Sequence, residues 1–211
     1  MVGLRERKKQ RTRQALIEAA LRLFDDKGFE ETTLAEIAAR ADVSTRTFFS
    51  YFASKEDVVF YDTHERLEMA VTTLATRRPG DSVTGVLLRI IEQSFEQAAA
   101  YEGLTPEDAA LRARLILTEP ALQARALLLL FDSQIRISKA LYEAFPERLT
   151  QEDAAAAVGA LIGAIKLAAM VNLEHHRSLE EVWAVARRAS EVALSGLRTR
   201  LSRPRLRPSP E

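Results

Sequence analysis

The sequence predicts an all-α protein of about nine helices, in which a small three-helix head precedes a larger helical body. Apolar residues recur at helical spacing along most of the chain. Helix-start signals, and Pro or Gly stops, separate these segments from one another. No window alternates apolar and polar residues with the period of two that a half-buried strand would show. These observations leave no segment that favours a strand.

Caps and stops place the individual helices. Gly28 suits the end of the first helix, a Thr33–Glu36 capping box begins the second, and Ser44 is an N-cap for the third. The expected helices cover residues 10–27, a short stretch after Thr33, another after Ser44, and then residues 55–78, 82–100, 105–118, 120–144, 150–176 and 178–201.

Three regions follow from this order. Residues 1–53 form the head, and residues 54–201 form the helical body. Residues 202–211, which read SRPRLRPSPE, are proline-rich and polar, so we expect a disordered tail.

The stretch Thr32–Asp57 has the pattern of a helix-turn-helix, whose second helix fits the DNA major groove. Phe48 and Phe52 stand four residues apart and mark the buried side of that helix. Thr45 and Arg46 then lie in its first turn, the part that reaches base edges. An arginine there can bond guanine bidentately. An ordinary helical hairpin with solvated polar residues is the alternative interpretation of the same spacing.

Residues 11–57 resemble the DNA-binding domain of TetR-family transcriptional repressors. Four pieces match the family pattern in order: TRQALIEAALRLFDDKGFEETT, LAEIAARADVS, TRTFFSYF and ASKED. The resemblance implies that Phe48 and Phe52 are core residues, and that Thr33 and Lys55 hold phosphates. The predicted DNA-binding residues are Thr33, Ser44, Thr45, Arg46, Thr47, Phe49, Tyr51 and Lys55.

Two residues depart from the family pattern. Asp42 stands in the turn where the family usually has Gly, and we expect the turn to survive because Asp tolerates the left-handed conformation. Phe49 stands where the family usually has Tyr, so a phosphate-bonding hydroxyl is missing and only apolar contact remains.

Composition restricts the remaining possibilities. Lys plus Arg and Asp plus Glu both number 30, but through Arg13 six basic residues oppose Glu6 alone. This arm suits phosphate or minor-groove contact, or is a solvated terminus. The chain has no Cys, which excludes disulfides. It shows no signal-peptide pattern and no uncharged stretch of about 18 apolar residues, so we expect a cytoplasmic protein.

In the resembled family the last two helices pair with their copies in a dimer. The segment DAAAAVGALIGAIKLAAM and a small-residue stripe after residue 178 are compatible with that, although packing within one chain explains them equally well. One recognition helix reads few base pairs, which independently favours a homodimer. The predicted interface residues are Val158, Gly159, Ile162, Gly163, Val182, Ala186, Ala189 and Ala193.

Aromatic and polar residues mix on the helices of the body, as in a small-molecule site. The resemblance implies an effector pocket there, and Leu117–Phe131 is similar to a branch whose ligand domain is acyl-CoA-like. The effector is therefore expected to be small and apolar or amphipathic. The predicted ligand residues are His64, Phe95, Phe131, Gln134, Lys166, Met170 and Asn172, with core packing as the alternative for each.

Catalysis is not indicated, because no phosphate loop or nucleophile elbow occurs and the His175–His176 pair lies on different helix faces. No cofactor or metal is implied. The sequence predicts a ligand-responsive repressor that binds a palindromic double-stranded operator as a homodimer and is released by an effector. A helical small-molecule carrier with a non-functional head is the alternative, and Phe49 is the feature that favours it.

Overall fold

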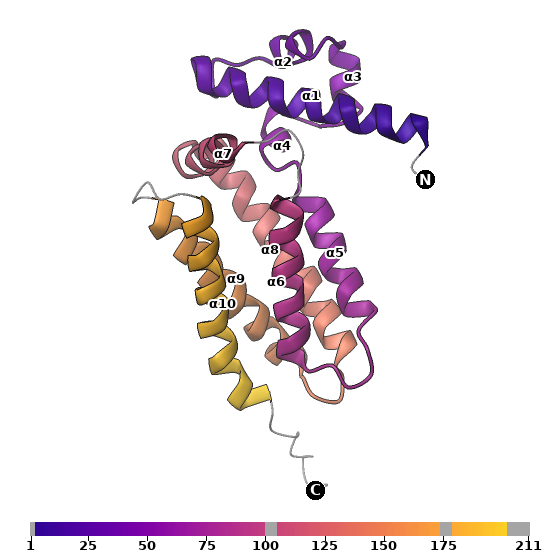
Figure 1. The fold of residues 1–211 in the computed structure, drawn as a ribbon, viewed down its shortest axis with the longest axis vertical. Coiled ribbons are helices and arrows are strands. Elements are labelled where there is room, and N and C mark those ends of the chain that lie inside the picture. The colour runs from indigo at the N-terminus through magenta and orange to yellow at the C-terminus, as the bar shows by residue number, and fades with distance from the viewer. Residues whose placement is uncertain (1–2, 100–104, 174–178, 202–211) are drawn as a thin grey trace, which may run out of the picture. The chain divides into compact units, whose positions relative to one another are not determined.

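The structure is a computed structural model that describes residues 3–99, 105–173 and 179–201, and these residues form ten α-helices and no strand (Figure 1). The prediction of an all-α fold is confirmed. The helices are α1 (Leu4–Lys27), α2 (Leu34–Arg40), α3 (Thr45–Phe49), α4 (Lys55–Val59), α5 (Thr63–Ala75), α6 (Val83–Ala99), α7 (Pro106–Thr118), α8 (Pro120–Ala144), α9 (Gln151–Leu173) and α10 (Leu179–Leu201). The expected tail at residues 202–211 lies outside the described residues.

The capping signals begin helices where the sequence predicts them. Thr33 and Glu36 form a reciprocal capping box at α2, and Thr105 with Asp108 does the same at α7. Before α9, the Asp153 N–H donates to the Thr150 hydroxyl oxygen over 3.0 Å. Each cap satisfies backbone donors that the first helical turn leaves without partners.

Two predicted boundaries were wrong. α1 begins at Leu4, six residues before the expected start at Gln10, because nothing between Gly3 and Gln10 breaks a helix. The expected fourth helix, residues 55–78, is two helices, with a break at Phe60–Asp62. Long-range contacts hold this break. Arg13 donates to the Tyr61 carbonyl, and Arg112 donates to the Asp62 carboxylate over 2.7 Å.

The Arg112–Asp62 pair is almost wholly buried. Burial alone would lower the pKa of Arg112, but the neighbouring Asp62 carboxylate offsets this and leaves the pKa raised. The guanidinium also stacks over the Tyr61 ring, 4.6 Å from its centroid. Removing one partner of such a pair would leave a buried charge uncompensated.

The chain folds into two compact units. The head unit comprises residues 1–63 and 101–128, and the body unit comprises residues 64–100 and 129–211. The head unit therefore extends past the predicted boundary after residue 53, since α4 packs on α1 and α7 joins the same core. α8 begins in the head unit and continues in the body unit.

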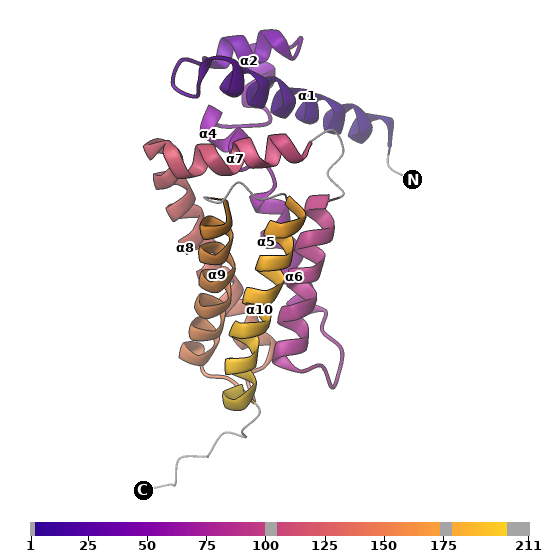
Figure 2. The same ribbon diagram turned by 60° about the vertical axis from the view of Figure 1, so that its left-hand side comes forward.

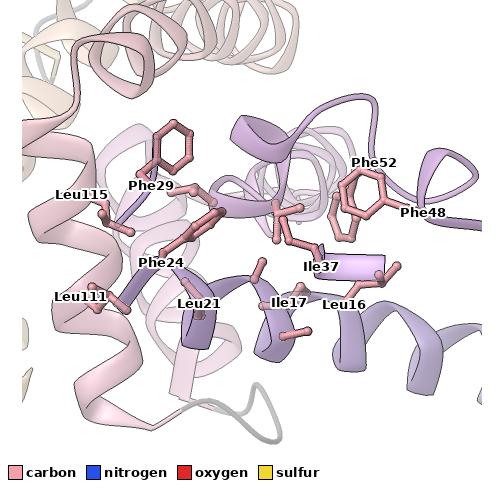
Figure 3. Packing of buried hydrophobic residues seen from close by; sticks show 14 of the residues in the cluster. Leu16, Ile17, Leu21, Phe24, Phe29, Ile37, Phe48, Phe52, Leu111 and Leu115 are labelled. Atoms are coloured by element: carbon pink, nitrogen blue, oxygen red, sulfur yellow. The ribbon is translucent and has the colours of Figure 1, made fainter. Parts of the chain in front are cut away.

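The head unit has a core of aromatic and aliphatic side chains from α1, α2, α3, α4 and α7 (Figure 3). Leu16, Ile17 and Leu21 supply the buried stripe of α1. The Phe24 and Phe29 rings lie 5.0 Å apart at the end of that helix. Leu111 and Leu115 of α7 complete the cluster. This core holds α2, α3 and α4 together with α1.

The body unit has a second core, to which α5, α6, the later part of α8, α9 and α10 contribute. Leu74, Leu141 and Leu149 are fully buried in it. α9 and α10 pack along each other, side by side in both views (Figures 1 and 2). α9 is long and apolar enough to cross a membrane by length and composition alone, yet only 22% of its most apolar stretch is buried within the chain.

Candidate nucleic-acid interface

The turn between α2 and α3 has the tight geometry of a helix-turn-helix. Asp42 adopts φ = 54°, the left-handed conformation expected of it, and is the one non-glycine residue with positive φ among the described residues. The Val43 N–H then donates to the Ala38 carbonyl over 2.9 Å, which closes the end of α2. The turn thus forms without the glycine that the family pattern has at this position.

Buried phenylalanines fix the orientation of α3. Phe48 is fully buried and Phe52 is 6% exposed, with their ring centroids 5.8 Å apart (Figure 3). The guanidinium of Arg13 on α1 lies 5.7 Å from the centroid of the Phe52 ring. Phe48 lies on α3, and Phe52 lies three residues beyond the end of α3, where its N–H donates to the Phe48 carbonyl over 3.0 Å. Because Phe48 holds one side of α3 in the head core, the exposed residues of the helix lie on its other sides.

That outward side carries the residues predicted to reach bases. Thr45 and Arg46 are exposed in the first turn, and Arg46 makes no ion pair with the residues that the structure describes. Phe49 is 55% exposed and contacts the Phe48 ring edge-on at 5.8 Å. An exposed Arg beside a Thr offers a guanidinium fork and a hydroxyl to base edges.

Other predicted contact residues hold the local structure together. The Ser44 hydroxyl accepts the Thr47 N–H over 3.1 Å and lies 2.9 Å from the Thr47 hydroxyl. The Thr33 hydroxyl donates to Glu36 over 2.7 Å. Tyr51 is half buried and packs against the head core. These four side chains therefore stabilise the local structure of the helix-turn-helix.

Glu36 shows the electrostatics at the start of α2. Hydrogen bonds from Lys27 and then Thr33 lower the pKa of this exposed carboxyl from 4.5 to about 2. The Lys27 ammonium is 2.6 Å from the carboxylate, which also faces the positive end of the α2 dipole. Glu36 is therefore an anion at physiological pH, and it ties the end of α1 to the start of α2.

Lys55, a predicted phosphate contact, makes hydrogen bonds within the head unit. Its ammonium donates to the carbonyl of Phe29 over 2.7 Å, and to those of Glu30 and Thr32 over 3.2 Å each. It also lies 4.4 Å from the centroid of the Phe29 ring. All three N–H donors are thus engaged. In this structure Lys55 holds the loop between α1 and α2, a contact between segments 25 residues apart that sequence pattern does not reveal.

The predicted ligand residues lie in the body unit but are mostly at its surface. His64, Phe131, Lys166 and Met170 are exposed, whereas Phe95 and Gln134 are half buried. The side chain of Asn172 lies outside the described residues. A pocket of about 490 Å³ opens elsewhere in this unit, and its walls include Leu74, Arg77 and Glu143.

Sequence reasoning missed one polar group in the body unit. The side-chain oxygen of Gln97 on α6 is buried and has no hydrogen-bond partner among the residues described. A buried acceptor without a donor is costly in a folded protein, so it marks a place for a water molecule or a ligand. Nothing in the linear pattern of α6 distinguishes this glutamine from Gln93.

The predicted dimer residues differ in how exposed they are on the single chain. Val158 and Ala186 are 1% and 4% exposed, so the core of their own chain already covers them. Gly159, Ile162, Gly163, Ala189 and Ala193 are half buried, and the Val182 side chain lies outside the described residues. One face of α9 runs through Ala156, Ala160, Gly163, Leu167 and Met170, and all of these except the half-buried Gly163 are exposed. We call these five residues the α9 seam.

The buried aromatic anchor of α3, the outward Thr–Arg pair and the closed turn are the features of a helix-turn-helix motif. Residues 16–61 match the family model described as bacterial regulatory proteins, tetR family. The match covers the helix-turn-helix and the helix before it, so this part of the chain is similar to the DNA-binding domain of that family of regulators.

Individual transcriptional regulators are similar to this chain as well. The HTH-type transcriptional regulator TcmR of Streptomyces glaucescens is 44% identical over 80 residues, which are 38% of this chain and 35% of that protein. The chain thus matches about a third of the length of this curated relative. Among solved structures, Thermus thermophilus FadR in complex with lauroyl-CoA covers 94% of this chain and 99% of its own at 24% identity, with a TM-score of 0.54.

The SmeT–triclosan complex gives a TM-score of 0.58 at 18% identity, and covers 95% of this chain and 98% of its own. SmeT is described as the repressor of the Stenotrophomonas maltophilia multidrug efflux pump SmeDEF. At these identities the two solved structures show a similar fold, and the similarity extends beyond the head over 94% and 95% of this chain.

Proposed function

We propose that this protein is a transcriptional repressor that binds a palindromic operator as a homodimer in the cytoplasm and is released by a small apolar or amphipathic effector. The observation that carries the proposal is the orientation of α3. Phe48 and Phe52 are buried, while Thr45 and Arg46 are exposed in the first turn. In a helix-turn-helix this turn enters the major groove.

The contacts divide into two kinds. Arg46 would bond the O6 and N7 atoms of a guanine, and Thr45 would bond a base or touch a thymine methyl group. Thr33, Ser44, Thr47, Phe49 and Tyr51 would contact the backbone around that groove. Lys55 acts from behind this surface, by holding the loop that precedes Thr33.

The α9 seam supports the homodimer. Its residues follow one another at intervals of 4, 3, 4 and 3, the spacing of a coiled-coil seam. Leu167 is 63% and Met170 is 43% exposed, and the small residues before them allow a second helix to approach closely. Exposed apolar side chains on one helix face indicate an interaction site. A two-fold dimer would pair the seam with its own copy.

The body unit supports an effector site. The unpaired oxygen of Gln97 and the half-buried Phe95 and Gln134 lie in this unit, and an apolar site with a few polar groups is typical of small-molecule binding. The solved structures named above hold lauroyl-CoA in FadR and triclosan in SmeT. We therefore expect an amphipathic effector, of which an acyl-CoA-like thioester is one kind.

Release would work through the spacing of the two α3 helices. An effector shifts this equilibrium only if it binds one spacing more tightly than the other. The break at Phe60–Asp62 interrupts the helix expected over residues 55–78. α4 belongs to the head unit, and the chain enters the body unit at His64, within α5.

Fluorescence anisotropy with labelled duplex from upstream of its own gene tests the proposal, with an unrelated duplex of equal length as competitor. Wild-type protein should prefer its upstream DNA, and Arg46→Ala should lose most of that preference. Arg22→Ala is the matched control, because Arg22 is an exposed arginine on α1 outside the helix-turn-helix.

Equal binding to both duplexes would contradict sequence-specific repression. A protein that binds an amphipathic molecule but no DNA would instead be the helical carrier.

A further inference from the structure

A pocket of about 490 Å³ opens in the body unit between the end of α5 and the end of α8, and we call it the α5–α8 pocket. Figure 1 shows these two helix ends next to each other. Apolar walls come from Val71, Leu74 and Ala140, and two charged side chains, Arg77 and Glu143, also line it. The volume suits a small molecule, since such sites measure roughly 300–1,000 Å³.

The α5–α8 pocket lies apart from the ligand residues that the sequence predicts. None of those that the structure describes lines it. His64 stands at the start of α5 and Leu74 near its end, about 15 Å apart along the helix axis at roughly 1.5 Å per residue. A ligand in this pocket would therefore occupy a further site in the same unit.

Arg77 is held in one orientation at the wall of the pocket. Its Nε–H donates to the carbonyl of Ala144, the last residue of α8. A basic side chain can cap the end of a helix in this way. The guanidinium also lies 4.4 Å from the centroid of the Phe145 ring. Because both contacts fix the group in advance, a ligand that binds it has less side-chain freedom to remove.

The terminal nitrogens of Arg77 remain available for a ligand. A guanidinium has five N–H donors, and the bond to Ala144 uses the one on Nε. Among the described residues Arg77 makes no ion pair and no other side-chain hydrogen bond. Two parallel N–H donors of this kind match the two oxygens of a carboxylate. The free side of Arg77 is therefore suited to a carboxylate.

The remaining charges of the pocket oppose an anion only weakly. The Glu143 side chain is 61% exposed, so water and salt screen it, and its carboxylate lies 4.0 Å from the Lys139 ammonium. The end of α8 carries about half a negative charge, and the Arg77 bond to the Ala144 carbonyl already engages it. The half-buried Arg77 is thus the charge that a ligand in this pocket meets with least screening.

We propose that the α5–α8 pocket binds a small amphipathic carboxylate. The carboxylate accepts hydrogen bonds from the terminal nitrogens of Arg77, and the apolar part of the molecule lies against Val71, Leu74 and Ala140. This site goes beyond the proposed function, because carboxylate binding here depends neither on DNA nor on the predicted effector residues.

Isothermal titration calorimetry with three probes of equal chain length tests the ligand class: octanoate, octanol and octylamine at neutral pH. Wild-type protein should bind octanoate roughly tenfold to a hundredfold more tightly than octanol, because a hydrogen bond between charged groups contributes more than a neutral one. Octylamine should bind most weakly, since its ammonium and Arg77 repel each other.

Arg77→Gln removes the charge and keeps an amide donor for the Ala144 carbonyl. This variant should bind octanoate and octanol with similar affinity. Arg148→Gln is the matched control, because Arg148 is an exposed arginine of the same unit that does not line the pocket, and it should keep the wild-type preference. Circular dichroism checks that each variant is folded.

Ala140→Phe provides a second test that leaves Arg77 in place. The added ring fills the pocket, so octanoate and octanol should both bind more weakly. In crystals of the wild-type protein soaked with ω-bromooctanoate, the anomalous bromine signal should lie in the α5–α8 pocket. Octanoate that does not bind at millimolar concentration, equal affinity for octanoate and octanol, an unchanged preference in Arg77→Gln, or a bromine signal elsewhere would each overturn the inference.

Discussion

The exposed faces of α3 and α9 are opposite in chemistry. α3 presents Thr45 and Arg46 to solvent, whereas α9 presents Leu167, Met170 and Val171, which are 63%, 43% and 58% exposed. A polar face is stable in water, so it can bind its partner reversibly. An exposed apolar helix face is typical of an interaction site. The difference fits the proposed function, in which the head binds DNA conditionally and the body pairs with a second copy.

The largest expected effect is on stability, and it distinguishes the buried side of α3 from the exposed side. Phe48→Ala should destabilise the protein by about 3–5 kcal/mol, because it empties a fully buried site in the head core. Phe49→Ala removes a ring that is 55% exposed and should cost less than about 1 kcal/mol. Urea denaturation followed by circular dichroism measures both. Equal losses would mean that α3 is not oriented as described.

The α9 seam should be the next most sensitive place. Leu167→Asp would put an unpaired carboxylate into the paired surface and weaken the dimer by about 3 kcal/mol, or roughly a hundredfold in dissociation constant. Sedimentation equilibrium measures this directly. Ala155→Asp is the control, since Ala155 is exposed on α9 but lies off the seam. A wild-type protein that stays monomeric at micromolar concentration would contradict pairing through the α9 seam.

Arg46→Ala should cost about 1–3 kcal/mol of operator affinity and relax preference at one base pair in each half-site. Its salt slope should change little, because the lost contact is to a base edge and not to a phosphate. Binding to a panel of single-base operator variants reveals which position loses discrimination. An unchanged ranking of the panel would show that Arg46 does not read sequence.

Lys55→Met distinguishes a structural lysine from a phosphate contact. The methionine keeps the apolar stem against Phe29 but leaves three carbonyls without their donor. The head should lose about 1–3 kcal/mol of stability, and the salt slope of DNA binding should stay at the wild-type value. If the variant instead kept its stability and its salt slope of DNA binding fell by about 0.9, Lys55 would contact a phosphate as the sequence predicts.

The smallest effect concerns pH. The folded pKa of Glu36 is about 2, below its ordinary value of 4.5, so the unfolded state binds the proton more readily. Its contribution to stability is complete above about pH 4.5 and is lost as pH falls toward 2. Glu36→Gln should flatten this part of the stability curve. If the variant and the wild type lose stability in parallel between pH 4.5 and 2, the carboxylate is not bonded as described.

Sequence predicted most of the fold because most helix ends are local. The capping boxes at Thr33 and Thr105, and the prolines at residues 79, 120 and 146, act within one turn of the boundary that they mark. The break between α4 and α5 is different. It depends on Arg13 and Arg112, which are about 50 residues away from Tyr61 and Asp62. No local pattern contains that information.

The residues of the candidate site also fall into two groups: those that the local pattern predicts and those that depend on distant contacts. The i, i+4 pair Phe48 and Phe52 predicts which side of α3 is buried, and therefore predicts the exposure of Thr45 and Arg46. Lys55 looks like a free cation in the sequence but donates to a loop 25 residues earlier. Val158 and Ala186 look like a dimer stripe but are covered by their own chain. A small-residue pattern cannot tell the two surfaces apart.

Selection from a random duplex library tests the central claim most directly, because it presumes no operator. The account predicts that wild-type protein enriches one motif repeated as an inverted pair, with half-sites about 10 base pairs apart or a multiple of that distance. Arg46→Ala should enrich a motif degenerate at one position of each half-site. A pool that stays random after repeated rounds, or a single unpaired motif, would contradict a dimeric reader of the major groove.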